Sequence, residues 1–207
     1  MRSEVWPLVH AERAALAEDL ALLDDAQWDE PSLCAGWTVR DVAAHLADSA
    51  RATRPGFLID MVRARFDFDR QNARGIERER GASPRETLAR LRAAGPRTTA
   101  PPGPLGTRLV EEVVHGEDIR RPLGIEHAYD PAAVVGALRT HTGMSASMGG
   151  AKALVAGLSL RATDADLVIG EGPEVRGSAL ALLLATSGRR VALSELEGPG
   201  LEWLASG

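Results

Sequence analysis

Cysteine is almost absent from the 207-residue sequence, which contains only Cys34, so an intrachain disulfide is excluded. This suits a reducing compartment. The N-terminal stretch, MRSEVWPLVHAERAALAEDL, has charges scattered through it and lacks the apolar segment of a signal peptide. No run of about 18 apolar residues occurs, so no membrane span is expected. We therefore expect a cytoplasmic protein without a membrane partner.

Aromatic residues and lysine are also scarce. Aromatic residues make up 4% of the chain, so the core must consist mostly of Ala, Val and Leu. Lysine occurs once, at Lys152, and nearly all the positive charge is arginine. The formal net charge is −5, and an acidic chain without an obvious basic patch predicts no nucleic-acid partner. The length fits one large domain or two small ones.

Helical periodicity dominates the first part of the chain, whereas short strand-like segments follow it. Thr38 with Asp41 three residues later is close to a capping box and predicts a helix start. Helices are expected at 3–25, 38–53, 55–74, 84–92, 107–121 and 131–148. Short strands are expected at 158–162, at 166–169 and beside GEGPEVRG, with a small buried helix at 178–187. We predict an α+β fold class, with a helical bundle at 1–148 and a small α+β domain at 149–207.

The stretch RLVEEVVHGEDIRRPLG, residues 108–124, combines helical spacing with side chains that can bind metal. Glu111 and His115 are four residues apart, which places them on one face of a helix. His45 lies at the edge of the apolar face of the earlier helix. If the two helices pack together, these three side chains form a divalent-metal site of the kind that catalytic zinc uses. Asp118 would orient a ligand histidine from outside the coordination sphere, or it would be a charge at the helix end that pairs with Arg120 or Arg121.

Each of these residues also has a simpler structural interpretation. A Glu and a His four apart often form a solvated helix face, and Glu112 competes with Glu111 as the carboxylate. Cys34 precedes a helix start and could be a nucleophile or a zinc ligand, but a single cysteine is more often a small buried hydrophobe. The remaining histidines, His10, His127 and His141, fit ordinary surface or core positions. GEGPEVRG lacks the ending of a phosphate-binding loop.

Three segments resemble the mycothiol-dependent maleylpyruvate isomerase family. LCAGWTVRDVAAHLADS is similar to a segment of the family's N-terminal part, a DinB-like four-helix bundle, and VEEVVHGEDIRRPLG is similar to its later metal helix. LSLRATDADLVIGEGPEVRGSALALLLATSGRR resembles its small C-terminal domain, which is sterol-carrier-protein-like. The resemblance runs from about Leu8 to Leu204 and is weakest at 55–105. It implies an up-and-down DinB-like bundle followed by a small α/β domain.

The resemblance also implies a ligand set and an activity. It assigns the metal to His45, Glu111 and His115, and it implies a catalytic arginine, for which Arg189 is the nearest match and Arg176 the rival. The metal would be zinc, with nickel or iron as alternatives. Mycothiol would be the thiol cosubstrate of an isomerase or S-transferase that acts on a small electrophilic molecule, in a monomer or homodimer. The alternatives are a non-catalytic metal-binding or regulatory module and a hydrolase that uses metal-bound water.

Overall fold

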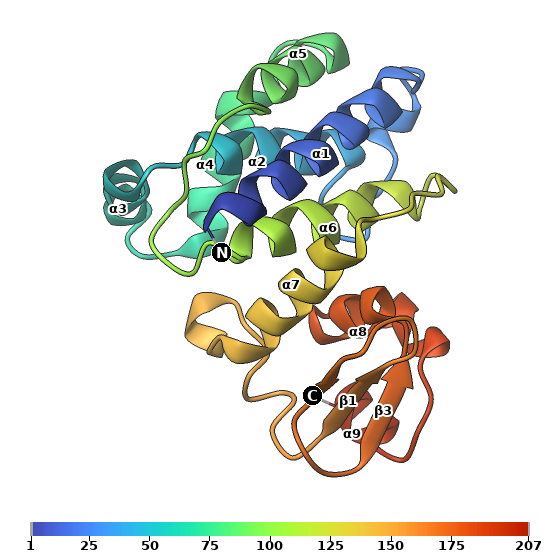
Figure 1. Cartoon of the computed structure of the whole chain (residues 1–207). Helices are drawn as coiled ribbons and strands as arrows, with labels where there is room; N and C mark the ends of the chain where they lie inside the picture. The colour runs from blue at the N-terminus through green and yellow to red at the C-terminus, as the bar shows by residue number, and fades with distance from the viewer. Residues whose placement is uncertain (1, 207) are drawn as a thin grey trace. The chain divides into compact units, whose positions relative to one another are not determined.

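The computed structural model describes residues 2–206 and divides the chain into two compact units, Met1–Ala128 and Tyr129–Gly207 (Figure 1). The sequence predicted the boundary twenty residues later, after residue 148. The difference concerns helix α7, Pro131–Gly143, which packs against α8, Ala179–Thr186, and belongs to the second unit. One reason is a buried hydrogen bond between the His141 ring and the Thr186 carbonyl, 3.1 Å long.

Four helices form the bundle of the first unit, as predicted. They are α1 (Arg2–Ala21), α2 (Val39–Arg51), α5 (Pro84–Ala94) and α6 (Thr107–Arg120). Both α1 and α2 contact α5 and α6, and Figure 1 shows α5 on one side of this pair and α6 on the other. Successive helices α1 and α2 therefore lie diagonally across the bundle, which differs from a simple up-and-down order of neighbours.

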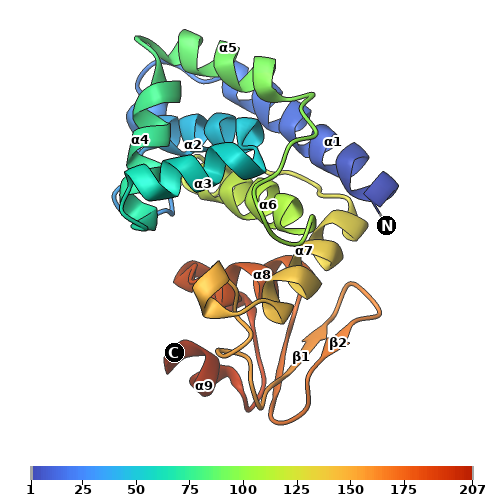
Figure 2. The ribbon, with the colours of Figure 1, turned by 90° about the vertical axis from the view of Figure 1, so that its left-hand side faces the viewer.

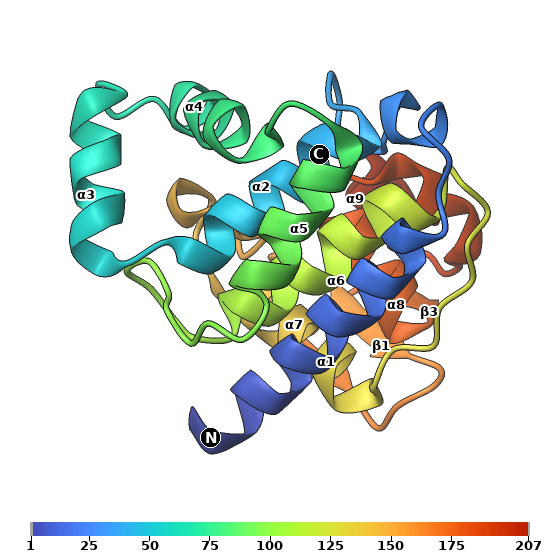
Figure 3. The ribbon, with the colours of Figure 1, turned by 90° about the horizontal axis from the view of Figure 1, so that it is seen from above.

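The connection from α2 to α5 contains two helices instead of the single helix expected at 55–74. Helix α3 spans Arg54–Arg63, and α4 spans Phe68–Arg80. Arg65 and Phe66 interrupt the helix because their φ angles are +58° and +61°, in the left-handed region. Helix α4 packs against α2 and α5, and α3 stands at the edge of the unit beside α4 (Figures 2 and 3).

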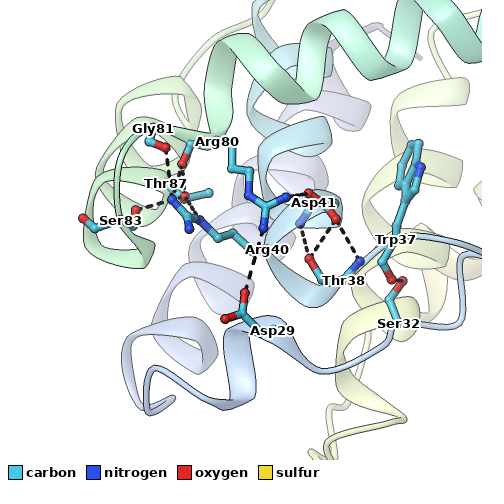
Figure 4. A network of polar contacts seen from close by, with 10 residues as sticks. All are labelled: Asp29, Ser32, Trp37, Thr38, Arg40, Asp41, Arg80, Gly81, Ser83 and Thr87. Atoms are coloured by element: carbon cyan, nitrogen blue, oxygen red, sulfur yellow. Dashed lines mark hydrogen bonds and ion pairs between the residues drawn. The ribbon is translucent and has the colours of Figure 1, made fainter.

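A polar network fixes the start of α2 (Figure 4). The predicted capping box is present: the Thr38 hydroxyl accepts a hydrogen bond from the Asp41 amide, and Asp41 accepts one from the Thr38 amide. Arg80, at the end of α4, donates to Asp41 over 2.6 Å. Arg40 donates to Thr87 on α5 and to the Arg80 and Gly81 carbonyls. The network anchors α2 to the turn between α4 and α5 and so positions the residues that follow on α2.

The second unit contains a three-stranded sheet of order β2-β1-β3. Strand β1 (Ser159–Ala162) pairs antiparallel with β2 (Val168–Ile169) and parallel with β3 (Glu174–Gly177). Helix α8 packs on this sheet and buries an apolar run, Leu182–Leu184. The predicted α+β fold class is thus confirmed. The short remaining helices are η1 Gln27–Asp29, η2 Ala146–Met148, η3 Arg190–Glu195 and α9 Leu201–Ser206. Over residues 2–206, no helix is both long and apolar enough to cross a membrane.

Candidate metal centre

The side chains of His45, Glu111 and His115 meet between α2 and α6. One ligand atom from each residue lies within 4.8 Å of the corresponding atoms of the other two. His45 Nε2 is 3.2 Å from a Glu111 carboxylate oxygen, and the two imidazole ring centroids are 4.8 Å apart. The three side chains are partly buried, so each keeps some contact with solvent. The expected packing of the two helices is therefore what brings these residues together.

Asp118 holds the ring of His115. The Nδ1 atom of His115 lies 2.8 Å from the Asp118 carboxylate, which is fully buried. Because an ionised carboxylate only accepts hydrogen bonds, this contact places the proton on Nδ1. The lone pair of the neutral imidazole is then on Nε2, the nitrogen that can bind a metal.

Glu111 is held as a carboxylate by neighbours on both helices. Its Oε2 atom receives a hydrogen bond from the Ser49 hydroxyl, 3.0 Å away, in addition to the contact with His45. Burial of Glu111 alone would raise its pKa. The hydrogen bond from His45 and the electrostatic interactions with His45, Arg108 and His115 outweigh burial and hold the pKa of Glu111 well below its ordinary value. The residue is thus ionised and ready to act as a ligand at neutral pH.

Glu112, the competing carboxylate, points to a different partner. It forms an ion pair with Arg13 of α1 at 2.7 Å, and both side chains are only 2% exposed. Burial raises the pKa of Glu112, and the charge and hydrogen bond of Arg13 oppose this rise. Its carboxylate is therefore part of the packing between α1 and α6, while Glu111 faces α2.

Trp37 forms an apolar wall beside the two histidines. Its ring centroid lies 5.0 Å from that of His45 and 6.2 Å from that of His115. The residue lies in the loop that precedes α2 and also packs against the buried cluster of the bundle. An aromatic wall limits the access of water to the nearby polar groups and gives the site a surface for the apolar part of a ligand.

Cys34 lies near His115 and Asp118. Its sulfur is within 4.8 Å of ligand atoms of both His115 and Asp118. Cys34 also packs against the buried cluster that contains Val39 and Ile119. The packing interpretation of this cysteine thus agrees with the structure, which in addition places the thiol next to His115.

The chemistry and geometry of the three donors suit a divalent metal. Two imidazole nitrogens and one carboxylate oxygen form a donor set known for catalytic zinc, which keeps a further position open. Donors around a tetrahedral zinc lie about 3.3 Å apart, and the 3.2 Å between His45 and Glu111 already matches that spacing.

Comparison with known proteins identifies a similar domain for residues 9–103 and a similar fold for nearly the whole chain. Residues 9–103 match the family model of the mycothiol maleylpyruvate isomerase N-terminal domain. The matched segment lies within the first unit and is similar to that domain. Two solved structures of the mycothiol-dependent maleylpyruvate isomerase, one of them a histidine-to-alanine mutant, are similar over 96% of this chain and 93% of theirs. Their TM-score is 0.60 for both, at 18% and 19% identity, which shows a shared fold. No curated protein matched the chain.

The match to the mycothiol maleylpyruvate isomerase N-terminal domain includes His45 but ends before Glu111 and His115. Those two residues are therefore candidates on the geometry of the site alone. The family prediction is confirmed for the N-terminal domain, and the fold prediction for nearly the whole chain.

The other sequence candidates contact different partners, each within its own unit. His10 contacts the Arg97 carbonyl, and His127 contacts Glu12 at 2.8 Å. His141 belongs to the second unit, where burial lowers its pKa. Arg189 precedes η3 and donates to the Ser187 carbonyl over 2.6 Å. Arg176 is half-exposed on β3, where it faces Glu197 at 3.7 Å.

Sequence reasoning missed Ser49 and Arg108, although both follow from helical spacing. Ser49 is four residues after His45, and Arg108 is three residues before Glu111, so each shares a helix face with a candidate ligand. The side chains meet in the structure, where Arg108 donates to the Ser49 hydroxyl over 2.7 Å. Inspection of the positions one turn away from each candidate ligand would have identified both.

Proposed function

We propose that the chain binds a divalent metal through His45, Glu111 and His115 and uses mycothiol to convert a small electrophilic substrate. The convergence of these three side chains from two helices carries the proposal. It occurs in a unit of which residues 9–103 are similar to the mycothiol maleylpyruvate isomerase N-terminal domain. Zinc suits the donor set best, and nickel or iron are the alternatives.

The residues around the site have distinct roles in this proposal. His45 and His115 supply nitrogen ligands, and Glu111 supplies an oxygen ligand whose charge partly neutralises the cation. Asp118 fixes the tautomer of His115 through its 2.8 Å contact. Trp37 shields one side from water. A bound divalent metal would lower the pKa of a coordinated thiol and supply thiolate at neutral pH.

That thiolate would attack an electrophilic carbon of the substrate. In an isomerase it adds to a conjugated double bond, rotation follows about the new single bond, and expulsion of the thiolate restores the double bond in the other geometry. In an S-transferase the new carbon–sulfur bond would remain, and either a leaving group would depart from the attacked carbon or the carbanion formed by addition would take up a proton. Arg189 is our candidate for holding a carboxylate of the substrate or cosubstrate, because a guanidinium can bind a carboxylate through two hydrogen bonds.

Incubation of the metal-loaded full chain with mycothiol and a panel of electrophiles tests this function. The panel contains cis-configured conjugated carboxylic acids, which report isomerisation, and alkylating electrophiles, which report S-transfer. We expect product only when both metal and mycothiol are present. The His45→Ala variant should form none, while His127→Ala should remain active, because His127 contacts Glu12 instead of the cluster.

Two other outcomes separate the alternative functions. Tight metal binding with no mycothiol binding in calorimetry and no product would support a non-catalytic metal-binding or regulatory module. Hydrolysis of ester or amide substrates by the metal-loaded chain without any thiol would support a hydrolase. Either result would contradict the mycothiol-dependent reaction.

A further inference from the structure

Ser49 and Arg108 lie beside the proposed ligands, one on each helix. Ser49 is on α2, one turn after His45, and Arg108 is on α6, just before Glu111. The Ser49 hydroxyl is 3.0 Å from Glu111 Oε2, and Arg108 Nη1 is 2.7 Å from the same hydroxyl. Arg108 is only 3% exposed, and Ser49 and Glu111 are partly buried.

The direction of these hydrogen bonds follows from the chemistry of the groups. A guanidinium can only donate, and a serine hydroxyl has a single proton. Because Arg108 donates to the Ser49 oxygen, the Ser49 proton is directed to Glu111. Arg108 also donates to the Ser49 backbone carbonyl over 3.1 Å, which fixes its side chain at a second point. A hydroxyl that accepts from a cation is polarised and donates more strongly.

Metal binding makes the bond from Ser49 more important. A histidine nitrogen that coordinates a metal has no proton to donate, so the contact between His45 Nε2 and Glu111 can no longer be a hydrogen bond. Of the two side-chain hydrogen bonds described for Glu111, the one from Ser49 then remains. It restrains the carboxylate in the direction of the site.

We propose that Ser49 and Arg108 are positioning residues, in which Arg108 orients the Ser49 hydroxyl and Ser49 orients Glu111 for metal binding. The inference rests on the proposed metal site and extends it to two residues that bind no metal themselves. Groups that orient a ligand from outside the coordination sphere commonly contribute a factor of about 10–100 to metal affinity.

Titration of the full chain with Co²⁺ tests this inference, because the visible absorption of bound cobalt reports both affinity and coordination geometry. We expect Ser49→Ala to weaken binding by about 10–100-fold and to alter the spectrum. Ser49→Thr retains a hydroxyl and should bind nearly as the wild type does. Unchanged affinity and spectrum in Ser49→Ala would overturn the inference.

A double-mutant cycle then tests the role of Arg108. In an Arg108→Gln background, Ser49→Ala should weaken cobalt binding by a smaller factor, because the hydroxyl is no longer oriented. Arg120→Gln is the matched control: Arg120 is buried on the same helix and pairs with Asp19. In that background the factor should equal the wild-type one. Equal factors in all three backgrounds would overturn the part assigned to Arg108.

A folding control and a replacement variant keep the outcomes distinct. Circular dichroism establishes that each variant is folded, and Arg108→Lys replaces Arg108→Gln if the latter does not fold, because lysine lacks the planar fork of arginine. A wild-type chain that binds no cobalt would overturn the proposed metal site and this inference together. If the wild type binds cobalt and Ser49→Ala binds it equally tightly, this inference alone would be overturned and the metal site would stand.

Discussion

Asp118 accepts a hydrogen bond from His115 Nδ1 over 2.8 Å, and its carboxylate is fully buried one turn further along the same helix. The contact fixes which nitrogen of His115 is available to a metal. It also shows why the three-residue spacing between His115 and Asp118 matters, since that spacing brings the two side chains together on α6.

We predict that Asp118→Asn weakens metal binding by about 10–100-fold, because an amide can donate to Nδ1 and so favours the wrong tautomer. Chelator competition at constant pH measures the effect. The exposed-face variant Asp130→Asn, at the start of α7, serves as a control of the same chemical change. Wild-type affinity in Asp118→Asn would show that His115 does not depend on this contact.

Changing Glu111 to glutamine should affect metal affinity, whereas changing Glu112 to glutamine should affect stability. Glu111→Gln should lose most metal affinity, with a factor of more than about 100, and retain stability. Glu112→Gln should bind metal normally but unfold more easily, because it leaves Arg13 buried without its charge partner. Breaking such a pair costs about 3–5 kcal/mol. Metal titration and urea unfolding of both variants decide the assignment, and the reverse pattern would exchange their roles.

Because His141 is buried, we predict that the free energy of unfolding depends on pH whether or not a metal is bound. Burial lowers the pKa of His141 from 6.5, with Arg189 adding to the shift and the hydrogen bond with Thr186 opposing it. The unfolded chain therefore takes up a proton that the folded chain resists. The unfolding free energy should fall as the pH drops below about 6.5 and level off below the folded pKa.

The variant His141→Gln measures this contribution, because glutamine can still donate to the Thr186 carbonyl. The unfolding free energy of the variant should depend less on pH than that of the wild type between about pH 7 and pH 5. His10→Gln is the control, since His10 is partly exposed in the other unit. A wild-type profile that matches that of His141→Gln would contradict the assignment.

The two arginine candidates of the second unit should differ in catalysis. Arg189→Lys should lower the rate with the substrate by at least about 10-fold if a two-point guanidinium contact is required. Arg176→Lys should have little effect, because Arg176 is half-exposed and faces Glu197. Metal affinity should be unchanged in both. Equal rates in all three proteins would remove Arg189 from the mechanism.

Local patterns predicted the parts of the site that depend on neighbours in sequence. The capping box at Thr38 and Asp41, and the spacing of Glu111 and His115, are determined within one or two helical turns. Helical periodicity likewise predicted α2 and α6, which bring His45 into the cluster. The choice between Glu111 and Glu112 required the resemblance, because it depends on Arg13, a residue 99 positions away in the sequence.

Other features could not be read from local patterns. The break between α3 and α4 occurs at Arg65 and Phe66, where the chain takes up positive φ angles without a glycine or proline to signal it. The boundary between the units depends on the packing of α7 against α8. Helical periodicity shows that α7 has an apolar face but does not show which unit covers that face.

The metal content of the full chain and of three histidine variants is the most direct test of the proposed centre. After metal loading and gel filtration, the wild type and His127→Ala should each retain one divalent metal per chain. His45→Ala and His115→Ala should retain almost none, because a site with three protein ligands has none to spare. Full occupancy in both His45→Ala and His115→Ala would contradict the metal centre on which the proposed function depends.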